Sequence, residues 1–380
     1  SMKKIILLFV IFLPIALFFD SCRKDDDDIP EPAPTDILID WDTIEYSPTG
    51  KELEGHILVP PIPTNSVNPL TEEGVHLGRM LFYDPILSGD STQACASCHN
   101  QEFGFTDNGK TFSEGVDGIE GNRNSMAIIN LVWKDRFFWE GRSASLEEQA
   151  LEPVPNPIEM HLEWGEAIVR LMRNVDYRVA FYKAFGIKTI QKEDVANALA
   201  QFERTLISID APYDQYYLGL NDDLSEDAIE GRDIFFSEVG DCFHCHGNDV
   251  NNLFAVNLFA NDGLDSAEDY LGLADKGLGS ITGNEIDNGM FRVPTLRNIE
   301  LTAPYMHDGR FQTLEEVVEH YDSGMKYSPN LDPNFAVRFK NGVYQGLGLT
   351  EKEKRQLVTF LESLTDTGFI NNPDFSSPFE

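Results

Sequence analysis

The sequence predicts an all-α protein of two domains, each built around a short run of cysteine and histidine. Apolar residues recur mostly at helical spacing, with little of the strict alternation that is typical of strands. The pattern C-x-x-C-H occurs twice, at Cys95–His99 and at Cys242–His246. The 380 residues also exceed the usual length of one domain. Together these observations predict two mostly helical domains with long loops.

Local signals place the helices of the N-terminal half. Thr71–Tyr83 is expected to form the helix that leads into the first run. Ser145-Leu-Glu-Glu148 has the S-x-x-E form of a capping box, in which two side chains bond the free backbone N–H groups at a helix start. In 194–208 the apolar residues follow helical spacing and indicate a buried face. Further helices are expected at 163–174 and 176–185.

The C-terminal half repeats only part of this order. A helix at 225–236 carries the chain into the second run, as the first helix does for the first run. The segment 247–289 is rich in Gly and Asn and is expected to form long loops. Two more capping boxes, Thr313-x-x-Glu316 and Thr350-x-x-Glu353, each open an amphipathic helix.

The two C-x-x-C-H runs are the attachment signature of haem c. Two thiols at this spacing can each form a thioether with a haem vinyl group, and the histidine that follows becomes an axial ligand of the iron. Zinc is the alternative, because two cysteine pairs can form a thiolate site. Zinc pairs are usually separated by only ~15–20 residues, whereas these two lie in different halves of the chain. We therefore expect covalent haem at Cys95 and Cys98 and at Cys242 and Cys245.

The N-terminus has the form of an export signal. Residues 1–22 combine Lys3 and Lys4 with an apolar stretch and end at Cys22. An apolar segment that ends at a cysteine resembles a bacterial lipoprotein signal, in which lipid would be attached to Cys22. Asp20 departs from the residues that usually precede the lipidated cysteine. Residues 23–49, acidic and then proline-rich, are expected to form an extended tether. These features predict an exported, membrane-anchored lipoprotein in the periplasm or on the cell surface.

The charge of the chain limits its partners. With 64 acidic and 29 basic residues, the net charge is −35, which repels the phosphates of nucleic acids. The same negative charge could attract a basic redox protein toward this one, or it could act only to keep the protein soluble. We expect no nucleic-acid partner.

Beyond the two runs, the chain resembles the bacterial dihaem cytochrome c peroxidase and MauG family from about Gly74 to Leu364. The segments that carry the resemblance are LFYDPILS (81–88), CASCH (95–99), GNRNS (121–125), FWEGRSASLEEQA (138–150), CFHCH (242–246) and FRVPTLRNIELTAPYMHDGRFQTLEEVVEHY (291–321). The resemblance implies a peroxidatic haem domain at 50–220 and an electron-transfer haem domain at 221–370.

The resemblance also implies roles for single residues. His99 would be the proximal ligand of the peroxidatic haem iron and His246 that of the electron-transfer haem. Glu159 would assist cleavage of the O–O bond of peroxide by moving a proton, supported by Gln149. Trp139 would lie between the two haems and help electrons to cross. A surface role for Glu159 and a core role for Trp139 are the ordinary alternatives.

A calcium ion between the domains is implied as well. The matching positions are Asn124, Thr302 and Pro304, which would bind partly through backbone carbonyls. Hard Ca²⁺ prefers such oxygen ligands.

The chain departs from the peroxidase pattern at two positions. Where many family members have a histidine that caps the resting peroxidatic iron, this chain has Val116, which cannot ligate iron. Where the peroxidases have a methionine on the second haem, this chain has Tyr321, as in MauG. Periodicity agrees, because Leu314, Val317, Val318 and Tyr321 share one helix face. The alternatives to Tyr321 are His320, Met306 and Met325, whereas His307 is expected to order the pocket without binding iron.

These features predict a dihaem peroxidase that reduces hydrogen peroxide with electrons from a small donor, a cytochrome c or a cupredoxin. A MauG-like oxidase that modifies residues of a partner protein is the first alternative. A dihaem cytochrome that only transfers electrons is the second. Family peroxidases are often dimers, so a homodimer is possible.

Overall fold

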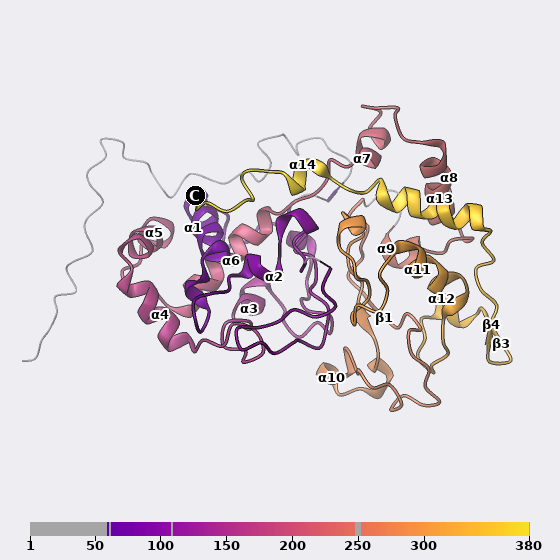
Figure 1. Cartoon of the computed structure of the whole chain (residues 1–380), viewed down its shortest axis with the longest axis horizontal. Coiled ribbons are helices and arrows are strands. Elements are labelled where there is room, and N and C mark those ends of the chain that lie inside the picture. Colours follow the sequence, from indigo (N-terminus) through magenta and orange to yellow (C-terminus); the bar gives the residue numbers. More distant parts are fainter. Residues whose placement is uncertain (1–58, 61, 108, 248–251, 380) are drawn as a thin grey trace, which may run out of the picture.

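The computed structural model describes residues 59–379, except 61, 108 and 248–251. The predicted signal 1–22 with Cys22 and the tether 23–49 lie outside these residues. Helices and loops dominate, and Figure 1 shows them gathered in two lobes side by side. No helix within the described residues has the length and apolar character needed to cross a membrane.

The N-terminal lobe contains the helices of the first half of the chain. Its α-helices are α1 (Glu72–Tyr83), α2 (Cys95–Cys98), α3 (Leu146–Ala150), α4 (Trp164–Arg173), α5 (Val175–Phe185) and α6 (Lys192–Thr205). Its 3₁₀ turns are η1 (Pro85–Leu87), η2 (Gln101–Phe103) and η3 (Leu131–Trp133). The helices expected from the sequence are present, with ends that differ by a few residues.

The C-terminal lobe is also helical but has longer loops. Its helical segments are α7 (Pro212–Tyr217), α8 (Glu226–Phe235), α9 (Phe243–His246), α10 (Gly279–Thr282), η4 (Glu285–Asp287), η5 (Ile299–Leu301), α11 (Leu314–Glu319), the π-helical turn η6 (His320–Gly324), α12 (Pro333–Ala336) and α13 (Glu351–Glu362). The last helix, α14 (Thr367–Ile370), follows α13 in the chain but packs against the N-terminal lobe. Two short antiparallel strand pairs are also present: β1 (Phe259–Ala260) pairs with β2 (Phe291–Arg292), and β3 (Phe339–Lys340) pairs with β4 (Val343–Tyr344). These strand pairs are so short that the fold is all-α, as predicted.

Capping side chains fix the helix starts that the sequence predicted. The Thr71 side chain accepts a hydrogen bond from the Gly74 N–H and begins α1. Thr313 and Thr350 form complete capping boxes at α11 and α13. The Ser145 hydroxyl accepts from the Glu148 N–H at 3.1 Å and begins α3. Each cap satisfies backbone donors that a helix start leaves unpaired.

The two lobes share a packing motif that the sequence did not reveal. In the N-terminal lobe α1 crosses α6, and a Cβ placed on Gly78 would lie 1.9 Å from the Ala198 carbonyl oxygen. In the C-terminal lobe α8 crosses α13, and a Cβ on Gly231 would lie 1.9 Å from the Gln356 carbonyl oxygen. Only glycine permits so close a crossing. The duplication therefore extends from the C-x-x-C-H runs to the helix pair that packs beside each of them.

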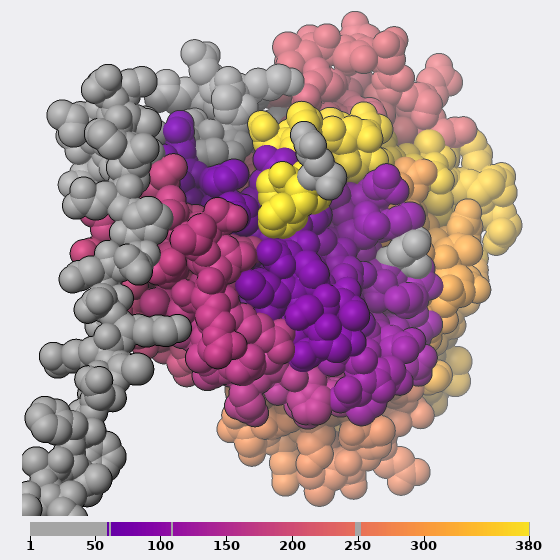
Figure 2. Space-filling view, turned by 60° about the vertical axis from the view of Figure 1, so that its left-hand side comes forward, coloured from indigo at the N-terminus to yellow at the C-terminus, as the bar shows by residue number. Residues whose placement is uncertain are grey.

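Each lobe has its own hydrophobic core, but the C-terminal residues cross from one to the other. After α13 the chain returns to the N-terminal lobe, where Phe369 and Phe375 are buried in its core. Tyr83 donates a hydrogen bond to the Phe375 carbonyl at 2.6 Å, and Arg79 donates to the Ser376 carbonyl at 2.6 Å. Figure 2 shows this yellow segment lying against the indigo and purple N-terminal residues. The domain limits taken from the sequence, 50–220 and 221–370, stay predictions.

Candidate functional site

The first C-x-x-C-H run opens into a cavity of the N-terminal lobe. The cavity contains about 1600 Å³, including space open to solvent, and Cys95, Cys98 and His99 line it. The His99 ring Nδ1 lies 2.8 Å from the Phe105 carbonyl oxygen. Because Nδ1 is bonded there, Nε2 is the nitrogen left for a metal. Burial lowers the pKa of His99, which favours the neutral imidazole that ligates iron.

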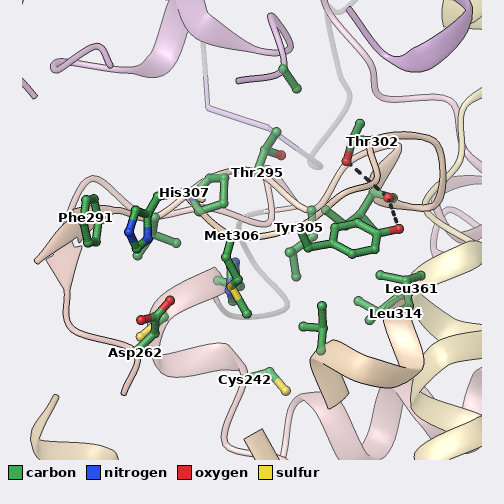
Figure 3. Close-up of a pocket in the computed structure, with 18 of the residues that line it drawn as sticks. Cys242, Asp262, Phe291, Thr295, Thr302, Tyr305, Met306, His307, Leu314 and Leu361 are labelled. Atoms are coloured by element: carbon green, nitrogen blue, oxygen red, sulfur yellow. Dashed lines mark hydrogen bonds between the residues drawn. The ribbon is translucent and has the colours of Figure 1, made fainter. Parts of the chain in front are cut away.

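The second run has the same arrangement in the C-terminal lobe. Cys242, Cys245 and His246 line a cavity of about 1670 Å³, again including open space. The His246 ring Nδ1 lies 3.4 Å from the Phe254 carbonyl oxygen. Burial lowers the pKa of His246 to about 4, so this ring is neutral as well. Figure 3 shows Cys242 on one side of this cavity and the loop that carries Met306 on the other.

The two carbonyl groups that orient these imidazoles belong to matching phenylalanines. Phe105 and Phe254 are both buried, and both have the left-handed backbone that non-glycine residues rarely adopt, with φ of 57° and 51°. They follow their histidines by six and eight residues. The sequence analysis missed both residues. The only signal was a phenylalanine at a similar distance after each run.

A buried ion pair supports the loop that orients His246. Arg297 is fully buried and forms a forked ion pair with Asp214. Its Nε also donates to the Asn252 carbonyl at 2.9 Å, two residues before Phe254. Such planar, bidentate geometry is the strongest form of side-chain ion pair. The pair thus ties α7 to the loop behind the second histidine.

The four cysteines fit thioether attachment better than a zinc site. All four are free thiols, and the two pairs line separate cavities, so they cannot surround one ion. Burial raises the pKa of Cys95, Cys242 and Cys245 to about 12 and that of Cys98 to about 11. Each pair lies with its histidine at the wall of a cavity large enough for a porphyrin. The donor set and its placement fit haem c.

Glu159 and Gln149 line the first cavity with His99. Asn156 Nδ2 donates to Glu159 Oε1 at 2.7 Å, which leaves Oε2 without this partner. Desolvation by burial raises the pKa of Glu159, and the Asn156 hydrogen bond opposes this only in part. A carboxyl group so placed can hold or release a proton inside the cavity. The structure thus brings together the residues that the sequence grouped here.

Val116 lies next to Glu159. Its backbone N–H donates to the Glu159 carbonyl oxygen at 2.9 Å. The segment in which the peroxidase pattern has a histidine therefore runs along the wall of the first cavity, where Ser113, Glu114 and Gly115 line it. The side chain at this place is aliphatic and offers no ligand.

Trp139 lies between the two sites and lines both cavities. Its Nε1 donates to the Asn124 carbonyl oxygen at 2.8 Å. Its ring also meets the His307 ring edge-on, with 6.4 Å between centroids. His307 in turn stacks on Phe291 at 3.7 Å, as Figure 3 shows from the side of the second cavity. The tryptophan is thus held in one orientation where the two cavities meet.

Tyr321 lines the second cavity, together with Leu314, Val317 and Val318. The helix face that periodicity predicted therefore points inward. Tyr321 lies in the π-helical turn η6, a distortion that is often found at functional sites. Burial raises the pKa of Tyr321 well above its ordinary value. A bound cation would favour the phenolate instead, because its charge reverses the effect of burial.

The alternatives to Tyr321 are not equally placed. His320 Nε2 lies 2.9 Å from the Asp262 carbonyl oxygen and does not line the cavity. Met325 is buried in a separate small cluster with Leu331 and Phe335. Met306 lines the cavity, as Tyr321 does. Two of the four candidates for the second iron ligand, Tyr321 and Met306, therefore line the same cavity as His246.

The residues expected to bind calcium lie together along the second cavity. Asn124, Thr302 and Pro304 all line it, and Asn124 lines the first cavity too. The Asn124 side-chain amide donates to the Lys110 and Thr111 carbonyls at 3.1 and 3.2 Å, which fixes its oxygen on the other side. The three residues predicted to bind calcium therefore lie along one cavity, and Asn124 lies where the two cavities meet.

Charged residues that the sequence analysis did not select also face the cavities. Arg292 is buried and lines both cavities, and Lys134 lines the second. Burial lowers the pKa of Lys134 to about 7 and that of Arg292 to about 10. Cations in such surroundings are suited to pair with the carboxylates of a bound cofactor. Nothing in their local sequence separates them from the other basic residues of the chain.

The comparisons with known proteins agree with this geometry. Residues 72–222 match the family model described as di-haem cytochrome c peroxidase. The chain is 36% identical over 304 residues to the methylamine utilization protein MauG of Methylorubrum extorquens, which covers 80% of this chain and 81% of that protein. It is 37% identical over 319 residues to the cytochrome c551 peroxidase of Nitrosomonas europaea, with 83% and 86% covered.

Solved structures show the same fold. A crystal structure of a MauG-like protein associated with microbial copper homeostasis superposes with a TM-score of 0.76 at 38% identity, covering 87% of this chain and 99% of that one. The diheme peroxidase BthA from Burkholderia thailandensis has a TM-score of 0.66 at 20% identity, covering 82% and 91%. The second likeness concerns the fold alone.

Proposed function

The chain belongs to the di-haem cytochrome c peroxidase family, and from this premise we propose that it reduces hydrogen peroxide with electrons from a small redox protein. Membership implies two covalently bound haem c groups. These haems supply the redox chemistry when bound. The residues of the chain supply attachment, access, protons and the route between the two sites.

The observation that carries the proposal is the buried carboxyl group of Glu159 in the same cavity as His99. Asn156 holds Glu159 Oε1, so Oε2 is the atom that takes a proton from peroxide and returns it to the departing oxygen. Gln149, on α3, lines the same wall and is the residue that would orient the substrate. The aliphatic side chain of Val116 would provide no ligand where the peroxidase pattern has a histidine.

The second cavity would serve as the relay. His246 and Tyr321 would hold the iron of a haem bound there, with Met306 as the alternative to Tyr321. Trp139 is the residue through which electrons would pass, because it lines both cavities and is fixed by the Asn124 carbonyl. Arg292 and Lys134 would pair with haem carboxylates.

Further features of the chain complete the proposal. Asn124, Thr302 and Pro304 would bind one Ca²⁺ near Trp139. Export and lipid attachment at Cys22 would place the protein in the periplasm or at the cell surface. The donor would be a cytochrome c or a cupredoxin, and a homodimer stays a prediction.

A second function is favoured by Tyr321 and Val116. Both positions depart from the peroxidase pattern in the direction of MauG. A MauG-like protein would use the same two cavities to oxidise residues of a partner protein. Relatives named as peroxidases and relatives named MauG match the chain at similar identity, so the comparisons do not favour this function over the peroxidase.

Steady-state turnover separates the two functions. The dihaem protein is mixed with hydrogen peroxide and a reduced cytochrome c or cupredoxin, and oxidation of the donor is followed by absorbance. Sustained turnover that consumes two donor electrons per peroxide supports the peroxidase. A single reaction with peroxide that leaves a long-lived oxidised protein, without donor turnover, would support the MauG-like function instead.

A further inference from the structure

Three potential metal ligands meet beside the second C-x-x-C-H run. His244 lies inside the run, and Asp241 and Glu238 precede it in the loop after α8. His244 Nε2 lies 3.2 Å from Asp241 Oδ1 and 3.6 Å from Glu238 Oε2. No other group of three or more His, Cys, Asp or Glu side chains within the described residues has its potential ligand atoms so close together.

The two distances from the His244 nitrogen are those of ligands around one ion. Zinc binds imidazole nitrogen and carboxylate oxygen at about 2.0–2.2 Å. In a tetrahedral site two ligands at about 2.1 Å are then roughly 3.4 Å apart. The two separations from the His244 nitrogen, 3.2 and 3.6 Å, lie on either side of this value. A charge-assisted hydrogen bond between histidine and aspartate would be shorter, at about 2.7–2.9 Å.

Arg338 holds the carboxylate of Asp241 and the backbone of Glu238 in place. Arg338 Nη2 lies 3.0 Å from Asp241 Oδ2 and donates at 3.0 Å to the Glu238 carbonyl. This leaves Asp241 Oδ1 turned toward His244. Asp241 is 94% buried, since only 6% of its surface is exposed, so its position is set by the fold. Partners that orient a ligand in this way are typical of metal sites.

We propose that Glu238, Asp241 and His244 bind one divalent first-row transition metal ion, with Zn²⁺ as the representative. One imidazole and two carboxylates match the borderline character of such an ion, whereas Ca²⁺ and Mg²⁺ prefer oxygen alone. Glu238 and His244 reach the surface, so the ion can enter from solvent and water can complete its coordination. The site uses neither His99 nor His246 and none of the proposed calcium ligands, although Asp241 also lines the second cavity.

The test is calorimetric titration of the dihaem protein with Zn²⁺ in a buffer that contains Ca²⁺. The wild-type protein should bind one Zn²⁺ per chain. His244→Ala and Glu238→Gln should each weaken this binding at least tenfold. His161→Ala is the matched control, because His161 is an exposed histidine that pairs with Asp117 alone, and it should bind as the wild type does.

Further controls distinguish loss of metal binding from loss of folding. Haem content and circular dichroism are measured for each protein to confirm that it is folded. Because Glu238 lies outside the C-x-x-C-H run, the Glu238→Gln variant still tests the metal site if His244→Ala impairs haem attachment. The proposal is overturned if the wild type shows no saturable Zn²⁺ binding, or if a folded His244 or Glu238 variant keeps the wild-type affinity. Neither outcome bears on peroxide turnover, so this test is independent of the proposed function.

Discussion

Replacing Glu159 by glutamine removes one proton-transfer group from the first cavity and changes little else. Asn156 donates to Glu159 Oε1 at 2.7 Å, and the amide oxygen of glutamine can accept the same bond. The amide nitrogen then takes the place of Oε2 and cannot accept a proton. The side chain keeps its size and burial, so the loss should fall on kcat. General acid–base catalysis contributes about 10²–10⁴-fold, which is about 3–5 kcal/mol of activation free energy at about 1.4 kcal/mol per factor of ten.

The pH dependence of kcat provides a second, independent test of the role of Glu159. Burial raises the pKa of Glu159 above the ordinary value of a carboxyl group. The group accepts a proton from peroxide only as the carboxylate, which predominates above that raised pKa. The kcat of the wild type should therefore fall as the pH is lowered through it. Glu159→Gln has no such group, so this acidic limb should be absent from its profile.

Stopped-flow measurement of donor oxidation over a range of pH provides both quantities. Glu163→Gln is the control, because Glu163 is an exposed carboxylate four positions further on. It should keep the wild-type kcat and the wild-type profile. If Glu159→Gln, with full haem content, turned over within threefold of the wild type or kept the acidic limb, the assignment of Glu159 would be refuted.

Three further predictions concern the second site and the fold. Tyr321→Phe should change the low-spin EPR signal of the C-terminal haem; an unchanged spectrum would exclude tyrosine ligation. Gly231→Ala adds a methyl group 1.9 Å from a backbone oxygen and should lower the free energy of unfolding by about 1–3 kcal/mol. The control is Gly165→Ala in α4, which should be neutral or stabilising because no atom lies within 4 Å of the added methyl group. Equal thermal stability of the two variants would contradict this prediction. Zn²⁺ should raise the reduction potential of the C-terminal haem, since it adds positive charge beside Cys242 and Cys245, and spectroelectrochemistry should find no shift in His244→Ala.

The sequence was sufficient for the features that depend on local pattern. Capping at Thr71, Thr313 and Thr350 involves side chains only three residues from their partners, so it can be read directly from the chain. The inward face of the helix before Tyr321 follows from helical periodicity in the same way. These signals need no knowledge of what packs against them.

Other features depend on contacts between distant segments and could not be read in this way. The carbonyls that orient His99 and His246 belong to loop residues whose backbone conformation is set by the surrounding core. The exclusion of His320 depends on its bond to Asp262, which lies 58 residues away. Arg292 acquires its place between the cavities only when the two lobes meet. In each case the sequence carries the residue but not the neighbour that gives it a role.

The crossing of the C-terminal segment into the N-terminal lobe has a consequence for how the protein is made. Phe369 and Phe375 belong to the core that surrounds the first C-x-x-C-H run, yet a ribosome synthesises them after both runs. The core of the N-terminal lobe therefore stays incomplete until synthesis has passed Phe375. Cys95 and Cys98 are thus expected to be more accessible to the enzymes that attach haem before this segment has docked than after. Docking of the segment after α13 would then be a late step in maturation, which joins the two lobes only when both have been synthesised.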